Sequence, residues 1–173
     1  MNNLKDIPEG TKILIDTNII LYTALNHPIY QKDCTDFLIR VGRKDVIGYI
    51  PSVVIEELLH HFMMSELIEN GYGKRVSDCI SCYKHNPMII EKLSKTWNEI
   101  QRVFHINCTI LYDNELILKQ SLQIAQRYQL LAHDAYIVAF AQSNDIFHIA
   151  SNDKDFLRVR EVTIWSPQRI DIL

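Results

Sequence analysis

The chain has 173 residues, 47% of them hydrophobic, and a formal net charge of −3 at pH 7. This length and apolar content suffice for one domain with an ample core, and the small negative charge excludes a protein that binds nucleic acid over its whole surface. No apolar run approaches the ~20 residues that span a bilayer, and the polar residues 1–6 lack the apolar core of a signal peptide. We therefore expect a cytoplasmic protein that does not enter a membrane.

Short apolar strands alternate with helices along the chain. The pattern predicts strands at 12–16, 46–50, 109–111, 147–151 and 162–165, and helices at about 28–42, 52–68, 87–104, 114–128 and 135–143. This alternation predicts a three-layer α/β/α sandwich around a mostly parallel sheet. The segment 71–105 contains only helix, so we expect one domain over 1–173 with a helical extension at about 71–105.

Several helix ends and faces are readable from residue type. We expect Ser52 and Asp113 to cap their helices, and the Asn86-Pro87 pair to start another. The helix after Pro87 is expected to bury one apolar stripe, made of Ile89, Leu93, Trp97, Ile100 and Phe104. The inner face of the next helix is expected to contain Ile117, Ser121, Ile124, Ala125 and Tyr128.

Four cysteines offer an alternative metal site. Cys79 and Cys82, followed by His85, have half of the spacing of a zinc site. Cys34 and Cys108 stand alone and far away in the sequence, so no second Cys-x-x-Cys pair completes a tetrahedron. Cys79 also falls on an apolar helical stripe, which is typical of ordinary helix core. The sequence therefore favours free thiols over structural zinc or disulfides.

Acidic residues stand at the tips of three apolar elements. Asp16 ends the first strand, Asp134 lies at the start of a helix, and Asp153 follows the strand 147–151. Each has a purely structural interpretation, as an Asx turn, a helix N-cap and a turn residue respectively. Together they indicate one pocket, because parallel α/β sheets bring the carboxyl ends of their strands to one edge and bind ligands there. Converging carboxylates repel one another unless a cation neutralises them, and their hard oxygens suit Mg²⁺ or Mn²⁺.

A fourth acid comes from the helix that starts near residue 52. Glu56 and Glu57 are about 100° apart around this helix, so only one of them can face the pocket. The pattern by itself does not choose between them, and both are also consistent with solvated helix residues. Glu57 and His60 have the spacing of a di-iron ligand pair, but that architecture needs two such motifs. We therefore expect His60 and His61 at the surface or at the rim of a site.

Four segments, in this order, resemble the motifs of PIN-domain nucleases. They are DTNIIL at 16–21, SVVIEEL at 52–58, HDAYIVAFA at 133–141 and SNDKDF at 151–156, of which the fourth is the most specific. The resemblance spans nearly the whole chain. It implies a PIN α/β/α sandwich and metal-dependent hydrolysis of RNA that leaves a 5′-phosphate and a 3′-hydroxyl.

The resemblance also assigns roles to individual residues. It maps the acidic site to Asp16, Glu57, Asp134 and Asp153, and it prefers Glu57 to Glu56 because the family has a Glu-Leu pair at this point. Asp16, Asp134 and Asp153 are expected to hold Mg²⁺ or Mn²⁺, with Glu57 holding metal-bound water. Two such ions would activate a water and compensate the charge on the phosphate. Supporting residues are expected to be Asn18, Ser151 and, as an accessory, Asp155.

Several functions compete for this site. The first is an RNA endonuclease, either the toxin of a toxin–antitoxin pair or an RNA-processing enzyme unrelated to such systems. The second is a catalytically weak PIN scaffold that binds RNA or a protein, although a scaffold has no use for four acids. A dehalogenase-type phosphatase needs a second Asp two residues after the first, where this chain has Asn18. Nucleotide-driven activity is excluded because the sequence has no Walker-type phosphate loop.

The extension carries a local positive charge. Segment 71–105 has six basic residues against three acidic ones, a net charge of +3 in a chain whose total is −3. Lys92, Lys95 and Arg102 recur at helical spacing opposite the apolar stripe, so we expect them to contact RNA; the alternative is a solvated helix face. We further expect a homodimer, and an antitoxin protein as a partner if the chain is a toxin.

Overall fold

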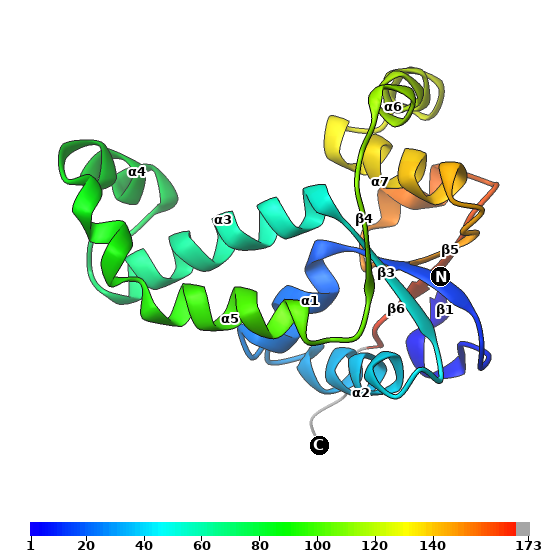
Figure 1. Cartoon of the computed structure of the whole chain (residues 1–173), viewed down its shortest axis with the longest axis horizontal. Helices are drawn as coiled ribbons and strands as arrows, with labels where there is room; N and C mark the ends of the chain where they lie inside the picture. The colour runs from blue at the N-terminus through cyan, green and yellow to red at the C-terminus, as the bar shows by residue number, and fades with distance from the viewer. Residues whose placement is uncertain (169–173) are drawn as a thin grey trace.

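The computed structural model describes residues 1–168 and is built around a six-stranded sheet in which all pairings are parallel (Figure 1). The strands are β1 Asn2–Asn3, β2 Lys12–Ile15, β3 Ile47–Pro51, β4 Thr109–Leu111, β5 His148–Ala150 and β6 Thr163–Ser166. Their order across the sheet is β1-β6-β5-β2-β3-β4. This confirms the predicted parallel sheet. The two-residue edge strand β1 is too short to leave a sequence pattern.

Seven α-helices and three short 3-10 helices connect the strands in the described part of the chain. The α-helices are α1 Thr17–Ala24, α2 Gln31–Gly42, α3 Ser52–Glu69, α4 Val76–His85, α5 Ser94–Phe104, α6 Glu115–Tyr128 and α7 Ala132–Ser143. The 3-10 helices are η1 Leu4–Asp6, η2 Pro87–Lys92 and η3 Lys154–Arg158. Within residues 1–168, no helix is long and apolar enough to cross a membrane.

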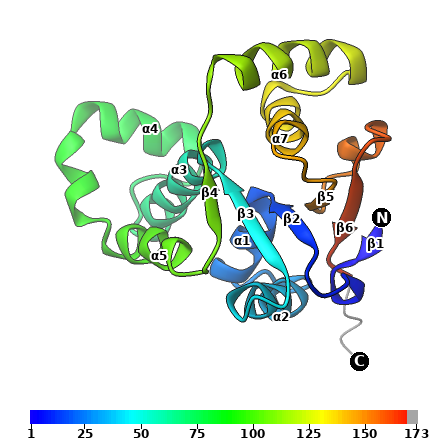
Figure 2. The ribbon, with the colours of Figure 1, turned by 45° about the vertical axis from the view of Figure 1, so that its right-hand side comes forward.

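The strand order places the helices in two layers. From β2 the chain moves outward to β3 and then to β4, and because parallel crossovers are right-handed, α1, α2 and α3 fall on one face. The chain then returns to β5 on the other side of β2, which puts α6 and α7 on the opposite face, as Figure 2 shows. The result is the expected α/β/α sandwich. The reversal of direction between β2 and β5 is the point where such sheets bind ligands.

The main core lies between the sheet and both helical layers. The strands β2 and β5 contribute fully buried apolar residues, and α7 buries almost its whole length, from Ala135 to Ala141. The sequence predicted a helix at about 135–143, and the structure shows that this helix is deeply buried. The inner face of α6 is also as predicted, since Ile117, Ser121 and Ile124 are buried.

The segment 71–105 forms the expected helical extension and has a small core of its own. Its buried apolar residues are Cys79 in α4, Ile89 in η2 and Leu93, and they pack against Met64 and Leu67 near the end of α3. The first half of α3 instead packs into the main core. The helix α3 therefore joins the extension to the sandwich.

The predicted stripe of the helix after Pro87 is partly wrong. Ile89, Leu93 and Ile100 are buried as predicted. Trp97 and Phe104, however, are 38% and 51% exposed, and Thr96 and Val103 are buried in their place. The reason is that the first turn is a 3-10 helix, η2, and the α-helix starts afresh at Ser94. A 3-10 helix has three residues per turn, so a stripe drawn with a single α-helical period drifts by one position.

Two helix starts also differ from the predictions. Ser52 is the first helical residue of α3 and Pro51 is its N-cap. The Asn86-Pro87 pair does start a helix, η2, as predicted, although the Asn86 side chain makes no capping bond. The N-cap of α6 is Asn114 rather than Asp113, and its side chain accepts a hydrogen bond from the Ile117 N–H at 3.0 Å. The helix α1 was not predicted, because eight residues rich in β-branched side chains are too few to show a helical period.

A buried acid in α3 accepts hydrogen bonds from the extension. The carboxylate of Glu66 accepts hydrogen bonds from the backbone N–H groups of Lys95, at 3.1 Å, and Thr96, at 2.7 Å. Glu66 is 5% exposed and so caps the N-terminus of α5 from another helix. On the surface nearby, Lys95 Nζ also lies 2.6 Å from Glu69 Oε2.

We expect Glu66→Ala to lower the free energy of unfolding by about 1–3 kcal/mol, because two N–H groups at the helix start lose their acceptors. Chemical unfolding of the purified protein measures this loss. The matched control is Glu69→Ala, which breaks only an exposed ion pair and should cost less than about 1 kcal/mol. Equal losses in the two variants would contradict the capping role.

Candidate active site

The candidate site lies where β2 and β5 end side by side. The register pairs Leu14 with Ile149 and Ile15 with Ala150, and the Asp16 N–H extends the ladder by donating to the Ala150 carbonyl at 3.0 Å. Asp16 and Ser151 therefore leave neighbouring strands at the same level. This brings together residues that are 135 positions apart in the sequence.

Asp16 is held in place by three hydrogen bonds. Its Oδ2 accepts from Ser151 Oγ at 2.6 Å and from the side-chain amide of Asn18, and its Oδ1 accepts from the Thr17 N–H at 2.7 Å. Burial raises the pKa of Asp16 to about 6, although the hydrogen bonds from Ser151 and Thr17 act in the opposite direction. A carboxylate in this position is ordered and its negative charge is incompletely compensated.

The loop after β5 is tied to the same network. The Asn18 amide donates to Ser151 Oγ at 3.0 Å, while Asn18 Oδ1 accepts from the Asn152 N–H at 3.1 Å. Ser151 Oγ also accepts from the Asp153 N–H at 3.0 Å. Asn18 and Ser151 therefore lie where the sequence predicted supporting residues, and they link the loop of Asp153 to Asp16.

Glu57, and not Glu56, faces the site. Glu57 lines the pocket from α3, and its Oε2 accepts a hydrogen bond from Thr17 Oγ1, while Glu56 is exposed. His133 Nε2 lies 2.8 Å from the same oxygen, and His61 Nε2 lies 3.8 Å from Oε1. Burial raises the pKa of Glu57, but the contacts with His133 and Thr17 outweigh this effect, so the pKa is lowered overall.

Asp134 and Asp153 complete the acidic lining. Burial raises the pKa of Asp134, and the negative charge of Asp153 raises it further, which shows that the two carboxylates repel each other. Asp153 also caps η3 by accepting from the Asp155 N–H at 2.8 Å. Asp155 itself points to Arg158, whose Nη2 lies 2.8 Å from its carboxylate. Asp155 is thus engaged in an ion pair beside the pocket.

The purely structural interpretations hold for two of these acids. Asp16 caps α1 and Asp153 caps η3, whereas α7 starts after Leu131 and Asp134 lies within its first turn. Capping uses the Oδ1 atom of both Asp16 and Asp153. Each of these Oδ1 atoms accepts a single capping hydrogen bond and keeps a second acceptor position, so a capping role does not prevent either residue from binding a cation.

The pocket between these groups has a volume of about 150 Å³. Its lining residues are Asp16, Thr17, Asn18, Leu21, Glu57, His61, His133, Asp134 and Asp153. Among residues 1–168, no three His, Cys, Asp or Glu side chains are already close enough to hold a metal ion. The donor set nevertheless suits a hard cation, because carboxylate oxygens dominate it and Asp134 and Asp153 repel each other without one.

Sequence reasoning missed two contacts of this site. Thr17 and His133 were present in the quoted motifs but had no assigned role. Thr17 directly follows Asp16, and His133 directly precedes Asp134. Only the tertiary structure shows that both contact Glu57. His60 is exposed and His61 lies at the rim, as expected. In the described part of the chain all four cysteines are free thiols, of which Cys79 is buried in the extension.

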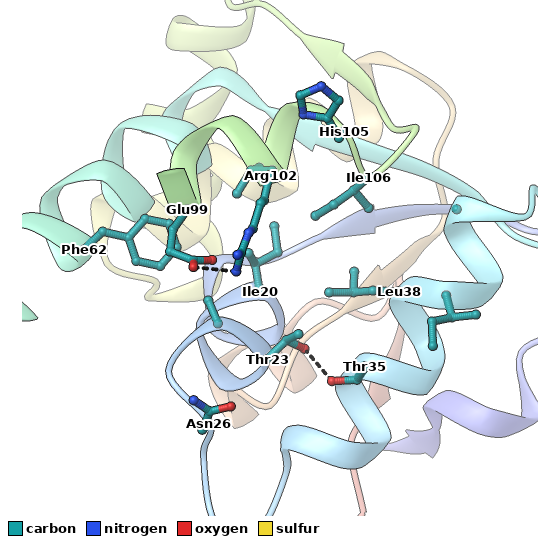
Figure 3. Close-up of a pocket in the computed structure, with 14 residues that line it drawn as sticks. Ile20, Thr23, Asn26, Thr35, Leu38, Phe62, Glu99, Arg102, His105 and Ile106 are labelled. Carbon is teal, nitrogen blue, oxygen red and sulfur yellow. Dashed lines mark hydrogen bonds and ion pairs between the residues drawn. The ribbon is translucent and has the colours of Figure 1, made fainter. Parts of the chain in front are cut away.

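A larger groove lies outside the acidic pocket (Figure 3). It has a volume of about 500 Å³ between α1, α2, α3 and the end of α5, and apolar side chains such as Ile20, Leu38 and Ile106 line it. An ion pair between Arg102 and Glu99, with a distance of 2.7 Å, lies at its edge. The groove shares no residue with the pocket of Asp16.

Fold and site together define a class of protein. The sequence matches the PIN domain model over residues 13–162, so the chain belongs to the PIN domain family. This confirms the resemblance on which the residue roles were based, although the roles themselves stay predictions.

Individual relatives agree with this family. The chain is similar to Ribonuclease VapC2 of Methanocaldococcus jannaschii, with 29% identity over 153 residues that cover 87% of this chain and 91% of the relative. Its fold is similar to that of VapBC2 from Rickettsia felis bound to a promoter DNA fragment, with a TM-score of 0.57, 14% identity, and coverage of 91% of this chain and 100% of that chain. A toxin–antitoxin complex from Klebsiella pneumoniae gives a TM-score of 0.56 at 17% identity and covers 91% and 99% of the two chains.

Proposed function

We propose that this protein is a metal-dependent endoribonuclease with Asp16, Glu57, Asp134 and Asp153 as its active-site acids. The observation that carries the proposal is that these four carboxylates, from four separate segments, line one pocket at the ligand-binding edge of a PIN-domain sheet. The name of the M. jannaschii relative, a ribonuclease that this chain matches over 87% of its length, supports the reaction class.

Mg²⁺ or Mn²⁺ is the proposed cofactor. Asp16, Asp134 and Asp153 would hold it, because their oxygens are hard donors and a cation relieves the repulsion that raises the pKa of Asp134. Bound divalent ions supply an activated water and compensate the charge on the phosphate and on the leaving oxygen.

The chain's own residues position these groups. Ser151 and Asn18 both donate to Asp16 Oδ2, so the orientation of this carboxylate is fixed before a substrate arrives. Glu57 is oriented by Thr17 and would accept a hydrogen bond from a water in the pocket. Asp155 supports the loop by pairing with Arg158 next to Asp153.

We further propose that this nuclease is the toxin of a toxin–antitoxin pair. One solved structure of similar fold is a toxin–antitoxin complex. The apolar groove between α1, α2 and α5 offers a surface for an apolar segment of an antitoxin protein. A small antitoxin-like reading frame next to this gene would support the toxin role. A different gene neighbourhood would favour an RNA-processing nuclease.

We also propose a homodimer. Leu118 and Leu122 lie one turn apart on α6 and are exposed, and Leu116 on the same helix is exposed as well. This apolar patch lies on a helix that covers one face of the sheet. A second copy of the same patch, related by a two-fold axis, would bury it.

Asp16→Asn should abolish metal-dependent RNA cleavage while the protein stays folded, because the near-isosteric amide removes one negative ligand. We expect a loss of more than about 100-fold, the upper end for residues that only support a metal ligand. Cleavage of a fluorogenic RNA and the melting temperature are the measurements. Glu57→Gln should also inactivate the protein, and exposed Glu56→Gln serves as its matched control. Wild-type cleavage by a pure Asp16→Asn preparation would overturn the proposed site.

Mg²⁺ or Mn²⁺ should raise the melting temperature of the wild type, because an ion that binds only the folded state stabilises it. At ten times Kd the gain is about 1.4 kcal/mol, or about 3–6 °C for a chain of this size. The gain should vanish in Asp134→Asn and in Asp153→Asn. Calorimetric titration without heat of divalent-ion binding near millimolar concentration would instead favour a PIN scaffold that binds RNA or a protein.

The contact of Lys92, Lys95 and Arg102 with RNA stays a prediction. Lys95 is paired with Glu69 and Arg102 with Glu99, so RNA would have to open two surface ion pairs, each worth less than about 1 kcal/mol. Replacing the three basic residues with Gln should weaken binding and flatten its salt dependence by about 0.7 in log–log slope for each lost phosphate contact. The control replaces the exposed residues Lys5, Lys12 and Arg43 with Gln. Equal affinity and slope for the two triple variants would leave the face of α5 as a solvated surface.

A further inference from the structure

We propose that His133 is a positioning residue that, together with Thr17, fixes the Glu57 carboxylate so that only one of its oxygens serves the acidic pocket. This inference rests on the proposed function and specifies how its fourth acid works. Glu57 would order water at the pocket, and it would not coordinate the cation through both oxygens.

The contact begins with the position of His133 in α7. His133 and Asp134 are consecutive residues in the first turn of this helix and both line the pocket, although they point about 100° apart. Asp134 can therefore face the other aspartates while His133 reaches across to α3. The His133 side chain is 29% exposed, and its Nε2 lies 2.8 Å from Glu57 Oε2. Nε2 is buried and has no well-aligned hydrogen bond to any described residue, so the contact is an ion pair in geometry.

The same oxygen of Glu57 has a second partner. Thr17 Oγ1 donates a hydrogen bond to Glu57 Oε2, and Thr17 is buried directly after Asp16. Two groups from two different elements thus converge on Oε2, one from the start of α1 and one from the start of α7. An oxygen that already has two such partners has little capacity left for a metal ion.

The other oxygen remains open. Glu57 Oε1 has His61 Nε2 as a neighbour at 3.8 Å, which is too long for a hydrogen bond. Oε1 can therefore accept a hydrogen bond from a water inside the pocket. Glu57 thus differs from Asp16 and Asp153: its carboxylate is held by a hydroxyl and an imidazole from two other helices, Asp16 is held by Ser151, Asn18 and the Thr17 N–H, and Asp153 accepts from the Asp155 N–H.

Kinetic measurements on His133 variants test this role. His133→Ala should lower kcat for RNA cleavage by about 10–100-fold, the range for groups that orient a metal ligand, with KM and the Mn²⁺ dissociation constant within about threefold of wild type. His133→Gln, which keeps a donor at a similar distance, should recover most of the lost kcat. The matched control is His60→Gln, which makes the same replacement at an exposed position and should leave kcat unchanged.

Three outcomes would overturn the inference. The first is an unchanged kcat in His133→Ala. The second is a tenfold loss of Mn²⁺ affinity in His133→Ala, parallel to its loss of kcat, which would place Glu57 among the direct ligands. The third is a His133→Gln variant as inactive as His133→Ala. The last would mean that the imidazole itself takes part in the chemistry.

A stability measurement separates this inference from the proposed function. His133→Ala, Glu57→Ala and the double variant form a thermodynamic cycle in the metal-free protein. The shift in melting temperature caused by His133→Ala should shrink by more than half when Glu57 is already Ala. Additive shifts would overturn the positioning contact even in an active nuclease. If the wild type cleaves RNA no faster than Asp16→Asn, the proposed function fails, while the cycle still decides whether His133 holds Glu57.

Discussion

The parallel pairing of β2 with β5 is the constraint on which the rest of the site depends. Its register places the Asp16 N–H on the Ala150 carbonyl and lets Ser151 Oγ reach Asp16 Oδ2 at 2.6 Å. A shift of one residue would turn every side chain of one strand to the other face, so Asp16 and Ser151 could not meet. The two strands are far apart in the sequence and are adjacent because the chain reverses its direction across the sheet between β4 and β5. The edge where ligands bind in open α/β sheets is created by this reversal.

The acids at this edge differ in how well the protein stabilises their ionised forms. Asp16 is almost completely buried, and its pKa of about 6 reflects the loss of water around the carboxylate. Asp134 is destabilised by burial and by Asp153, whereas the pKa of Glu57 is lowered overall by the contacts with His133 and Thr17. The ionised forms of Asp16 and Asp134 are thus destabilised in a way that a bound cation would relieve, whereas Glu57 already has its compensation within the protein. This division explains how four acids in one pocket can serve different purposes.

The helix α3 connects this site to the part of the chain that lies outside the sandwich. Its first turns carry Glu57 and pack into the main core, while Met64 and Leu67 near its end form the core of the extension with Cys79, Ile89 and Leu93. Glu66 adds a direct bond by capping α5. The extension is therefore built onto the same helix that supplies the fourth acid, but Glu57 and Leu67 are ten residues apart, about 15 Å along the helix axis. The pocket and the extension therefore share the helix α3 but lie at different points along it.

The sequence by itself determined the class of fold and predicted which aspartates lie at the edge of the sheet. Alternating apolar strands and helices predict a parallel sheet, and a parallel sheet in turn sends Asp16 and Asp153 to one edge without any knowledge of the pairing order. The sequence did not determine which residues of α5 are buried. The 3-10 turn at Pro87 breaks the α-helical period, so Trp97 and Phe104 are exposed. The choice between Glu56 and Glu57 needed the family motif, and the structure supplies the geometric reason, since only Glu57 turns toward Thr17. The role of His133 was decided by the tertiary structure alone: its contact with Glu57 joins α7 to α3, and the distance between two helices is set by core packing that no local pattern encodes.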